Sequence, residues 1–339
     1  MAEQRFSIKS IWEELEEYED ITPFSSYTWA SNWIKIWGKN IYLPLIKNSN
    51  QVIGLAPFVK TMGKLRLIGY NNSDYLGFLY KPGFENEFFE ALAEELVKKG
   101  MVLLDLDHLP EKYYDVEIRG YEKTCIKQDI CPYIVLPSDW DAYVSGLNKR
   151  FRKNIEYCQR RVNRDYIVKY ELVSKKQDVK PTLLKMIKMH QERWRGKKLP
   201  GAFYSQKIVD FHLNLAEDMF KRKYLDLHRL IINDEIAAVL YAFHKGKRTY
   251  YYLSGFDGKY KNLSIGILLT MLAIKTSIER KDIVFDFLRG NESYKFNFCN
   301  AKKYNYRMVF HRGVFAGLRS RIIERESSLI SAVKAYFEK

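Results

Sequence analysis

The spacing of apolar residues predicts an ordered succession of helices and strands in the second part of the chain. Apolar positions repeated every three to four residues indicate helices, and alternating apolar and polar positions indicate strands. The short connections Asn233-Asp234 and Lys245-Gly246-Lys247 predict hairpins between three central strands. The expected elements are a basic helix over 139–164, a strand over 166–173, helices over 180–195 and 205–223, strands over 225–232, 235–244 and 248–256, a helix over 265–280, a strand over 283–288, a short helix around 292–299, a strand over 306–312 and a C-terminal helix.

The first part of the chain repeats this order more weakly. In both parts a hairpin, a further strand, a helix and a strand centred on an acid follow one another, and the two acids are Asp105 and Asp286. Such self-similarity predicts a duplicated fold. The elements expected here are a helix over 27–37, a hairpin of 41–47 with 51–60, strands over 64–69 and 75–80, a helix over 84–99 and a strand over 101–106.

The predicted fold class is therefore α/β, of the α+β type, with two tandem halves. Each half is expected to be a mixed, mostly antiparallel sheet flanked by helices. A length of 339 residues is enough for two domains with separate cores. We expect an N-terminal domain over 1–138 and a C-terminal domain, which carries the working site, over 139–339.

Charge is the compositional feature that bears on function. Lys and Arg outnumber Asp and Glu by 56 to 41, which gives a net charge of +15. Residues 1–20 carry seven acids, so the basic surplus lies further along the chain. A surplus of this size attracts nucleic acid, anionic lipid headgroups or the phosphates of a cofactor.

The cysteines and the apolar stretches indicate the cellular compartment of the protein and its relation to membranes. The four cysteines form no C-x-x-C pair and share no metal-ligand spacing with His, so we expect reduced thiols, no metal and a cytoplasmic protein. The start of the chain has no apolar segment typical of a secretory signal. The longest apolar stretch, 265–274, is shorter than the roughly 20 residues that span a bilayer. We expect no membrane span, although the basic surface leaves peripheral contact with anionic lipid open.

The loop before the helix over 265–280 is a candidate phosphate site. The first turn of a helix offers unpaired N–H groups and a partial positive charge. Ser264 and Gly266 allow a close approach, Lys259 and Lys261 add charge, and no acid occurs between 265 and 278. The equivalent helix of the first half begins with two glutamates near its start, which complement their own helix dipole. An ordinary N-cap formed by Ser264 is the structural alternative.

Polar residues are concentrated after the strand over 283–288. Asp286 and Glu292 are candidate bases, and Arg289 and Lys295 are candidate anion contacts. Equally, Asp286 could serve structurally, by capping or by pairing with Lys295.

Two further groups have both a functional and a structural interpretation. His190, Arg193 and Trp194 share one face near a helix end and would either line a cleft or serve packing. Seven basic residues within 149–164 lie over an apolar stripe with helical spacing. They form either a solvated helix face or a groove for an anionic polymer such as tRNA.

Several segments resemble one known superfamily. They are Trp29 and Trp33, residues 52–57, Leu67-Ile68-Gly69, Ser73-Asp74-Tyr75, His190 with Arg193-Trp194, Ser264-Ile265-Gly266 and, most specifically, the run from Phe285 to Lys295. The chain resembles the GNAT N-acyltransferases over about 24–298, and more closely their CelD-like branch, which is associated with cellulose biosynthesis. It is similar, more distantly, to FemAB-type aminoacyl-tRNA-dependent transferases, which pair two GNAT-like halves.

The resemblance implies transfer of an acyl group from acyl-CoA, such as acetyl-CoA, to an amine or hydroxyl. The acceptor would be a small molecule or a saccharide in polysaccharide or cell-envelope biosynthesis. The superfamily's pyrophosphate loop, Arg/Gln-x-x-Gly-x-Gly/Ala, is reduced here to a single glycine. The residues expected to bind the donor are Lys259, Lys261, Asn262, Ser264, Ile265, Gly266 and Ile267.

The expected mechanism is direct attack of the acceptor on the thioester. Asp286, Glu292 and His190, in that order, are the candidates for acid–base or acceptor-orienting roles. Tyr252 or Tyr294 would protonate the departing thiolate.

Arg193, Trp194, Arg289 and Lys295 are expected to contact substrate. We also expect the first half to form one wall of the acceptor cleft, through Asp74 and Tyr75 in the polar turn over 71–75.

Two alternatives remain at this stage. One is a tRNA-dependent aminoacyltransferase of the FemAB kind, which would use the positive charge directly. The other is a non-catalytic protein that keeps the fold and binds anionic lipid or polymer.

Overall fold

The computed structural model describes residues 7–314, 316–319, 321–323 and 325. The chain forms two compact units. Unit 1 comprises residues 1–130 and 303–339, and unit 2 comprises residues 131–302. These bounds differ from the predicted division at 138/139, because strand β14 (Ala301–His311) pairs antiparallel with β7 (Leu103–Pro110) of unit 1. The predicted C-terminal helix lies partly outside the described residues.

Unit 1 contains two sheets with helices packed against them. Its larger sheet has the order β1-β4-β5-β7-β14-β8, and its smaller sheet has the order β2-β3-β6. β5 and β7 pair in parallel, whereas β4 pairs antiparallel with both β1 and β5. The remaining elements are α1 (Ile8–Leu15), α2 (Tyr27–Trp37), β1 (Ile41–Tyr42), β2 (Leu45–Asn48), β3 (Gln51–Leu55), β4 (Phe58–Thr61), β5 (Lys64–Leu67), β6 (Leu79–Tyr80), α3 (Glu85–Lys98) and β8 (Glu122–Val135).

The predicted hairpin of 41–47 with 51–60 is wrong as a single ladder. Each of its two expected strands is divided, and β1 with β4 joins one sheet while β2 with β3 joins the other. The divisions fall at Pro44 and Pro57, which lack the N–H group that a continuous ladder needs. Helix α1 and strand β8 were not predicted. Most residues of β8 are only half-buried, so its pattern of apolar positions is weak.

The core of unit 1 is rich in aromatic side chains. Phe78 lies at its centre, with ring centroids 5.3–5.9 Å from those of four other rings, and these pairs stabilise the core beyond their buried area. Helix α3 contributes the buried side chains of Phe88, Phe89 and Leu92 to this cluster. The core therefore joins α3 to the strands of the unit.

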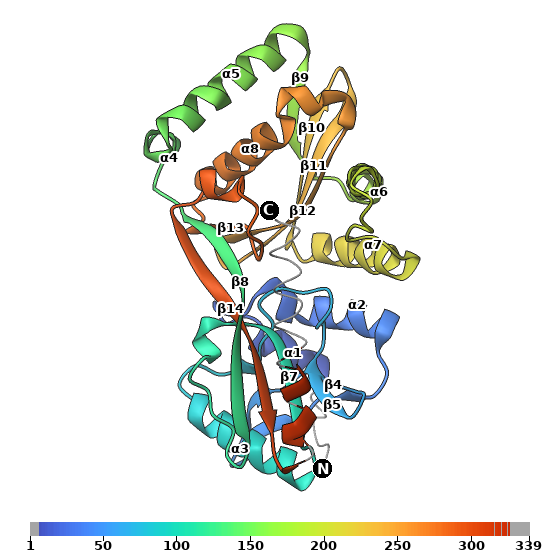
Figure 1. Ribbon diagram of the computed structural model, residues 1–339, viewed down its shortest axis with the longest axis vertical. Helices are drawn as coiled ribbons and strands as arrows, with labels where there is room; N and C mark the ends of the chain where they lie inside the picture. The colour runs from blue at the N-terminus through green and yellow to red at the C-terminus, as the bar shows by residue number, and fades with distance from the viewer. Residues whose placement is uncertain (1–6, 315, 320, 324, 326–339) are drawn as a thin grey trace. The chain divides into compact units, whose positions relative to one another are not determined.

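Unit 2 is a mixed sheet with helices on both faces. Its strand order is β8-β13-β12-β11-β10-β9, in which β12 and β13 are parallel and β9, β10, β11 and β12 form an antiparallel series. Helices α4, α5 and α8 lie on one face, and α6 and α7 lie on the other (Figure 1). The elements are α4 (Trp140–Gly146), α5 (Lys149–Asp165), β9 (Val168–Leu172), α6 (Lys176–Gly196), α7 (Gln206–Lys221), β10 (Leu225–Ile232), β11 (Glu235–Lys245), β12 (Arg248–Phe256), α8 (Ile265–Glu279) and β13 (Val284–Asp286).

Two predicted helices of unit 2 are corrected. The helix over 139–164 is two helices, because Leu147 is extended and the Asn148 side chain accepts a hydrogen bond from the Arg150 N–H to start α5. The helix around 292–299 is only a 3₁₀ turn, Lys295–Asn297. Side-chain contacts hold that segment instead, since Phe298 packs between Phe151 and Phe287.

Helix α8 is apolar on all sides and is buried between the sheet and α5. Its side chains pack with the face of β11 that carries Ala238, Leu240 and Ala242. The neighbouring positions of β11 face α7, where Tyr241 contacts His212. Each unit is thus a mixed, mostly antiparallel arrangement of strands flanked by helices, which confirms the predicted fold class. Within the described residues, no helix is both long and apolar enough to cross a membrane.

Candidate functional site at the start of helix α8

A cavity of about 240 Å³ in unit 2 lies where α6, β12 and the first turn of α8 meet. The predicted loop residues Lys261, Ser264, Ile265, Gly266 and Ile267 line this cavity. The other lining residues are Arg193, Tyr251, Ser254, Phe256, Tyr260, Thr270 and Tyr294. The structure therefore brings together the predicted loop, one basic residue of α6 and one of the two predicted tyrosines.

The first turn of α8 has no side-chain cap. Ser264 is in the left-handed region, with φ 53°, and its side chain makes no capping hydrogen bond. Its carbonyl accepts the N–H groups of Ile267 and Leu268. The first N–H groups of a helix have no intrahelical partner, so those of Ile265 and Gly266 are available to a ligand. The ordinary N-cap alternative is therefore wrong for the Ser264 hydroxyl.

The electrostatics of this helix start favour an anion. No acid occurs in the first turn of α8, so the partial positive charge of the helix is not compensated there. A Cβ atom at Gly266 would lie 3.5 Å from the Phe256 ring, an ordinary contact, so glycine keeps the cavity open without being sterically required. Helix α3 of unit 1, in contrast, carries Glu85 and Glu87 in its first turn, as predicted.

Two predicted donor-binding residues lie outside the cavity lining. The Lys259 ammonium is 3.5 Å from the Glu235 carboxylate at the surface. The Asn262 carbonyl accepts a hydrogen bond from Arg161 at 3.2 Å, which connects the loop to the basic helix α5. Asn262 therefore holds the loop, and its predicted contact with a donor remains a prediction.

Tyrosine hydroxyls and a serine form the polar wall of the cavity. The Tyr251 hydroxyl donates to Ser254 Oγ at 2.7 Å. Burial is the main cause that raises the pKa of Tyr294 far above its usual range, and nearby Tyr251 and Glu292 add to the shift. The Tyr294 hydroxyl therefore stays protonated at neutral pH. The Tyr251 ring also stacks on Phe287, with centroids 5.4 Å apart. This wall offers fixed O–H groups rather than a charged base.

Tyr251, rather than the predicted Tyr252, faces the cavity. Successive strand residues point to opposite faces of a sheet. The Tyr252 ring contacts His212 and Phe243 on the side of α7, with centroids 5.4 and 5.5 Å away. Tyr252 is thus in an aromatic core, and a catalytic role for it finds no support in this geometry.

His190 is a buried residue with both ring nitrogens engaged. Its Nε2 accepts the Ala202 N–H at 3.3 Å, which leaves the proton on Nδ1 to donate to the Ser254 carbonyl at 3.1 Å. Burial lowers the pKa of His190, so the neutral ring persists at pH 7. His190 therefore positions Ser254 of the cavity wall.

The side chains of Arg193 and Trp194, the neighbours of His190 on α6, make different contacts. The Trp194 ring lies 5.9 Å from the His190 ring. The Arg193 guanidinium lies over the Phe256 ring at 4.9 Å and lines the cavity. Of the predicted pair, only Arg193 reaches the cavity wall.

The acidic segment after β13 forms a closed cluster beside the cavity. Asp286 is 1% exposed, and its Oδ1 accepts the Leu288 N–H at 2.8 Å. The Lys295 ammonium donates to the Arg289 carbonyl and pairs with Glu292, each at 2.9 Å. A Cβ atom at Gly290 would lie 2.2 Å from Glu292 Oε2, so the cluster packs against a bare glycine.

This cluster favours the structural interpretation of Asp286, in which its carboxylate caps a turn by accepting the Leu288 N–H. Burial and the negative charge of Asp286 raise the pKa of Cys299 to about 12, with Lys295 opposing the shift. Asp286, Arg289, Glu292 and Lys295 are absent from the cavity lining, where the segment is represented by Tyr294. Their catalytic and substrate-binding roles remain predictions.

The two predicted site residues of the first half are buried in unit 1. Asp74 is 4% and Tyr75 is 3% exposed. The Tyr75 carbonyl accepts the Thr22 hydroxyl at 3.1 Å, and the Lys303 ammonium lies over the Tyr75 ring at 4.3 Å. Their contribution to acceptor binding remains a prediction.

Five lining residues were not predicted as site residues: Tyr251, Ser254, Phe256, Tyr260 and Thr270. The alternation along β12 was the available signal for Tyr251, because it places neighbouring tyrosines on opposite faces. Thr270 follows Gly266 by four residues on α8, and its hydroxyl donates to the Gly266 carbonyl at 2.8 Å. In the part of the chain that the structure describes, no three His, Cys, Asp or Glu side chains come together as a metal site.

The cavity lies in a part of the chain that is similar to a known domain family. Residues 149–296 match the family model described as "Acetyltransferase (GNAT) domain". All the cavity-lining residues fall within this match. No curated protein matches the chain.

Solved structures share the fold over most of the chain. FemX has 12% identity and a TM-score of 0.65, covering 94% of this chain and 98% of its own. The C-terminal domain of a putative lysylphosphatidylglycerol synthetase from Agrobacterium fabrum has 11% identity and a TM-score of 0.56, covering 86% and 89%. L-PGS from Bacillus licheniformis has 13% identity and a TM-score of 0.50, covering 84% and 90%. Residues 149–296 are thus similar to the GNAT acetyltransferase domain, and the α8 cavity lies within them.

Proposed function

We propose that the protein is an acyl-CoA-dependent acyltransferase, and that the cavity at the start of α8 receives the donor. The observation that carries the proposal is the uncapped, acid-free first turn of α8, which opens into a cavity within the GNAT-matched residues. The N–H groups of Ile265 and Gly266 would bind the donor's pyrophosphate, as helix N-termini do. Lys261 and Arg193 on the rim add positive charge.

In the proposed reaction an acceptor amine or hydroxyl attacks the thioester carbonyl. A new bond from the acceptor nitrogen or oxygen to the acyl carbon forms as the carbon–sulfur bond breaks. The Tyr294 hydroxyl donates its proton to the departing thiolate, and solvent returns it. A proton donor at this position must be protonated at neutral pH, as the buried Tyr294 hydroxyl is.

The remaining wall residues hold other groups in position and do not exchange protons. The neutral His190 ring holds the Ser254 carbonyl, and the Tyr251 hydroxyl is fixed by Ser254 Oγ. Fixed dipoles of this kind stabilise developing charge because they need no reorganisation during the reaction. For the acceptor's proton we propose Glu292, which is 57% exposed, ahead of the buried Asp286.

The proposed acceptor is a small molecule or saccharide in polysaccharide or cell-envelope biosynthesis, in the cytoplasm, where acyl-CoA is available. This assignment rests on the CelD-like resemblance. An aminoacyl-tRNA-dependent transferase is the second candidate. It is favoured by the FemX likeness and by the Arg161–Asn262 hydrogen bond, which connects basic helix α5 to the donor loop.

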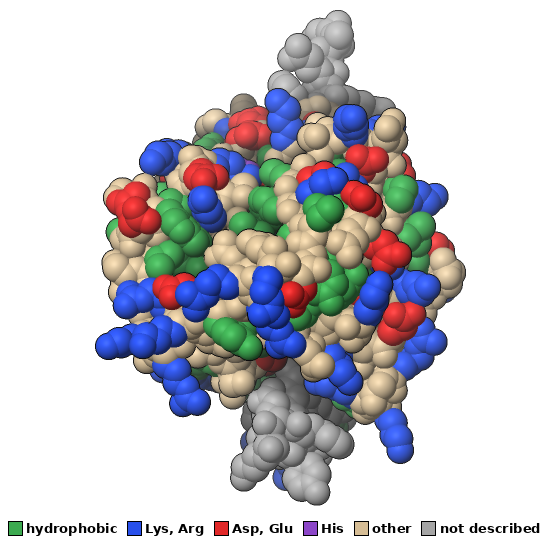
Figure 2. Space-filling model, turned by 90° about the horizontal axis from the view of Figure 1, so that it is seen from above, with side chains coloured by type: hydrophobic (Ala, Val, Ile, Leu, Met, Phe, Trp, Pro, Cys, Tyr) green, Lys and Arg blue, Asp and Glu red, His purple; other side chains and the backbone are tan. Residues whose placement is uncertain are grey.

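The surface charge bears on that second candidate and on non-catalytic binding of an anionic polymer. The seven basic residues of α5 are exposed or half-exposed over a buried stripe that includes Phe151, Ile155 and Val162. On the face shown in Figure 2, however, Lys and Arg side chains are interspersed with Asp and Glu rather than gathered in one field. A continuous basic field would favour a polymer more strongly.

The test is titration calorimetry of the full chain with acetyl-CoA and, separately, with bulk tRNA. We expect saturable acetyl-CoA binding that weakens at least about tenfold in Gly266→Glu, since a carboxylate in the first turn repels the pyrophosphate. Gly146→Glu is the matched control, because it adds the same charge in unit 2 at a position with open space around the new Cβ atom.

Equal acetyl-CoA affinity in the two variants would refute the proposed site. Salt-sensitive tRNA binding without acetyl-CoA binding would transfer the proposal to the tRNA-dependent reaction. Acetyl-CoA binding without turnover of any acceptor would favour the non-catalytic alternative.

A further inference from the structure

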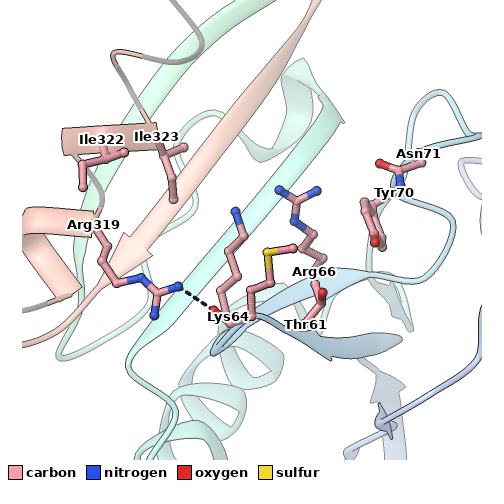
Figure 3. Close-up of a pocket in the computed structure, with 9 residues that line it drawn as sticks. Thr61, Lys64, Arg66, Tyr70, Asn71, Arg319, Ile322 and Ile323 are labelled. Atoms are coloured by element: carbon pink, nitrogen blue, oxygen red, sulfur yellow. Dashed lines mark hydrogen bonds between the residues drawn. The ribbon is translucent and has the colours of Figure 1, made fainter.

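Unit 1 contains a separate cavity of about 450 Å³ beside strand β5. Lys64 and Arg66 of β5 point into it side by side, with Tyr70 and Asn71 on one side and residues of the C-terminal segment on the other (Figure 3). The complete lining is Thr61, Met62, Lys64, Arg66, Tyr70, Asn71, Arg319, Ile322 and Ile323. Lys64, Arg66 and Arg319 are cationic, and none of these lining residues is acidic.

The alternation of β5 produces this basic wall. In Lys64-Leu65-Arg66-Leu67 the two leucines are buried in the core of unit 1, so the two cations project from the opposite face. Arg319 approaches from the C-terminal segment and donates to the Met62 carbonyl. The three cations therefore come from two parts of the chain that are more than 250 residues apart in sequence.

The structural explanation for the cations is the buried carboxylate of Asp105 on β7. Asp105 is fully buried and accepts hydrogen bonds from Lys64 and Arg66. Arg307 already provides a two-pronged partner, with Nε to Oδ1 at 2.6 Å and Nη2 to Oδ2 at 2.9 Å. One guanidinium in this geometry balances the charge of one carboxylate. Asp105 alone therefore does not explain three further cations.

The charge balance at the cavity is positive. Asp107, the second acid behind the wall, lies 3.2 Å from Arg307 and 3.9 Å from Arg66. Burial raises the pKa of Asp107, and the charges of Arg307 and Arg66 oppose that shift. Lys64, Arg66 and Arg307 thus face two acids, and Arg319 adds a fourth positive charge to the lining. The side chains of Lys64 and Arg66 are only 12% and 17% exposed, so solvent screens their charge incompletely.

The uncharged part of the lining is suited to an organic group. The Arg66 guanidinium lies over the Tyr70 ring at 4.6 Å, which holds its plane. Asn71 and Thr61 supply hydrogen-bonding groups, while Met62, Ile322 and Ile323 supply apolar surface. A planar guanidinium beside an ammonium suits the several oxygens of a phosphate.

We infer that the β5 cavity is a second anion site, which binds the phosphate group of a small organic phosphate through Lys64, Arg66 and Arg319. The ligand's organic part packs on Tyr70 and the two isoleucines. The phosphate comes either from a soluble metabolite or from a lipid headgroup. This site is independent of the donor cavity of unit 2 and holds whether or not the donor is acyl-CoA.

The test uses the full chain carrying Gly266→Glu, so that the α8 cavity contributes no phosphate binding. Inorganic pyrophosphate is titrated by calorimetry, and sedimentation with vesicles of equal parts phosphatidylglycerol and phosphatidylcholine probes the lipid source. The test variant adds Lys64→Met and Arg319→Ala, which leave Asp105 paired with Arg307 and Arg66. Arg321→Ala, an exposed cation of the same segment, is the matched control.

We expect binding that weakens at least about tenfold in the test variant and is unchanged in the control, because only the test variant loses charge-assisted hydrogen bonds to the phosphate. Variant-sensitive pyrophosphate binding identifies a soluble phosphate, and variant-sensitive binding to vesicles alone identifies a lipid headgroup. The inference is overturned if neither probe binds, or if the test variant binds as well as the control. Circular dichroism of the test variant verifies that it is folded.

Discussion

The cavity of unit 2 offers an anion backbone N–H groups and tyrosine hydroxyls, whereas the cavity of unit 1 offers three cationic side chains. The first arrangement derives its positive potential from a helix dipole that no acid compensates. The second derives it from formal charges that must be held near a buried carboxylate, Asp105. The two cavities thus reach a similar electrostatic result by different means.

The two sites therefore depend on different parts of the chain. Backbone N–H groups remain in place as long as α8 is folded, so single side chains matter there mainly for chemistry and access. Side-chain cations repel one another and require a counter-charge. Unit 1 therefore depends strongly on Asp105, and unit 2 has no equivalent dependence at its cavity. The predictions below test this contrast.

The largest effect is expected for Asp105→Ala. It leaves Arg307, Arg66 and Lys64 without their shared carboxylate, and breaking a buried ion pair costs about 3–5 kcal/mol. Urea unfolding, monitored by tryptophan fluorescence, measures this loss in the free energy of unfolding. Lys64→Met, the control, should cost less than about 1 kcal/mol, since Asp105 keeps two arginines. A loss of stability in Asp105→Ala no larger than in Lys64→Met would contradict the contrast.

Acid should weaken unit 1 through the same residue. Burial acts to raise the pKa of Asp105, but the hydrogen bonds and charges of Arg307, Arg66 and Lys64 outweigh it and lower the pKa to about 2, against 3.8 for the free side chain. A lowered folded pKa gives stability that is present above the unfolded pKa and is lost as pH falls through the folded one. The loss from about pH 5 to about pH 2 should be about 2 kcal/mol.

The measurement is unfolding at both pH values in the wild type and in Asp105→Asn. The loss of stability in Asp105→Asn is subtracted from the loss in the wild type, because a second acid titrates in the same range. Against the effect of burial, His244 and Arg280 lower the pKa of Asp282 in unit 2 to about 2. The variant should lose about 2 kcal/mol less than the wild type on acidification. Equal losses would show that Asp105 is not the acid-sensitive group.

Tyr294→Phe tests whether the unit 2 cavity uses its hydroxyls for chemistry. We expect kcat to fall about tenfold or more, with the KM for acyl-CoA within about twofold, because a proton donor acts in the reaction and not in binding. Tyr252→Phe is the control, since its ring lies in the aromatic core on the other face of β12. The assignment is wrong if Tyr252→Phe slows the reaction and Tyr294→Phe does not.

The smallest effect is expected at α3, the helix of unit 1 whose first turn is acidic. Replacing Glu85 and Glu87 by Gln removes charges that complement the helix dipole and should cost less than about 1 kcal/mol in thermal unfolding. Acetyl-CoA should still bind once per chain. A second, newly formed binding event would mean that acid-free helix starts alone determine donor binding, without the α8 cavity.

Some elements were predictable to the residue from local patterns. Helix α2 begins at Tyr27, as predicted, because Ser26 caps it by accepting the Trp29 N–H. Strands β10 and β12 also have their predicted bounds, since hairpin turns separate runs with clear apolar patterns. Strand β8 was missed, because its half-buried residues become a strand only by pairing with distant partners such as β13.

The candidate site divides in the same way. The sequence pointed to the loop from Ser264 to Ile267 as a candidate, because a helix start without acids can be recognised within about ten residues. The meeting of Tyr294 with Tyr251 and Ser254 was not predicted, because Tyr294 follows β13 whereas the other two residues lie on β12.

Patterns in the sequence predicted most of the order of elements, the α/β class, the acid-free start of α8 and the two acidic strands. These depend on periodicity and on chemistry within one or two helical turns. Only the tertiary structure decided that Asp105 is surrounded by cations while Asp286 caps a turn, and that Tyr251 rather than Tyr252 faces the cavity. The reason is physical: burial, pairing and electrostatic environment are set by residues that are distant along the chain and meet only in the folded protein.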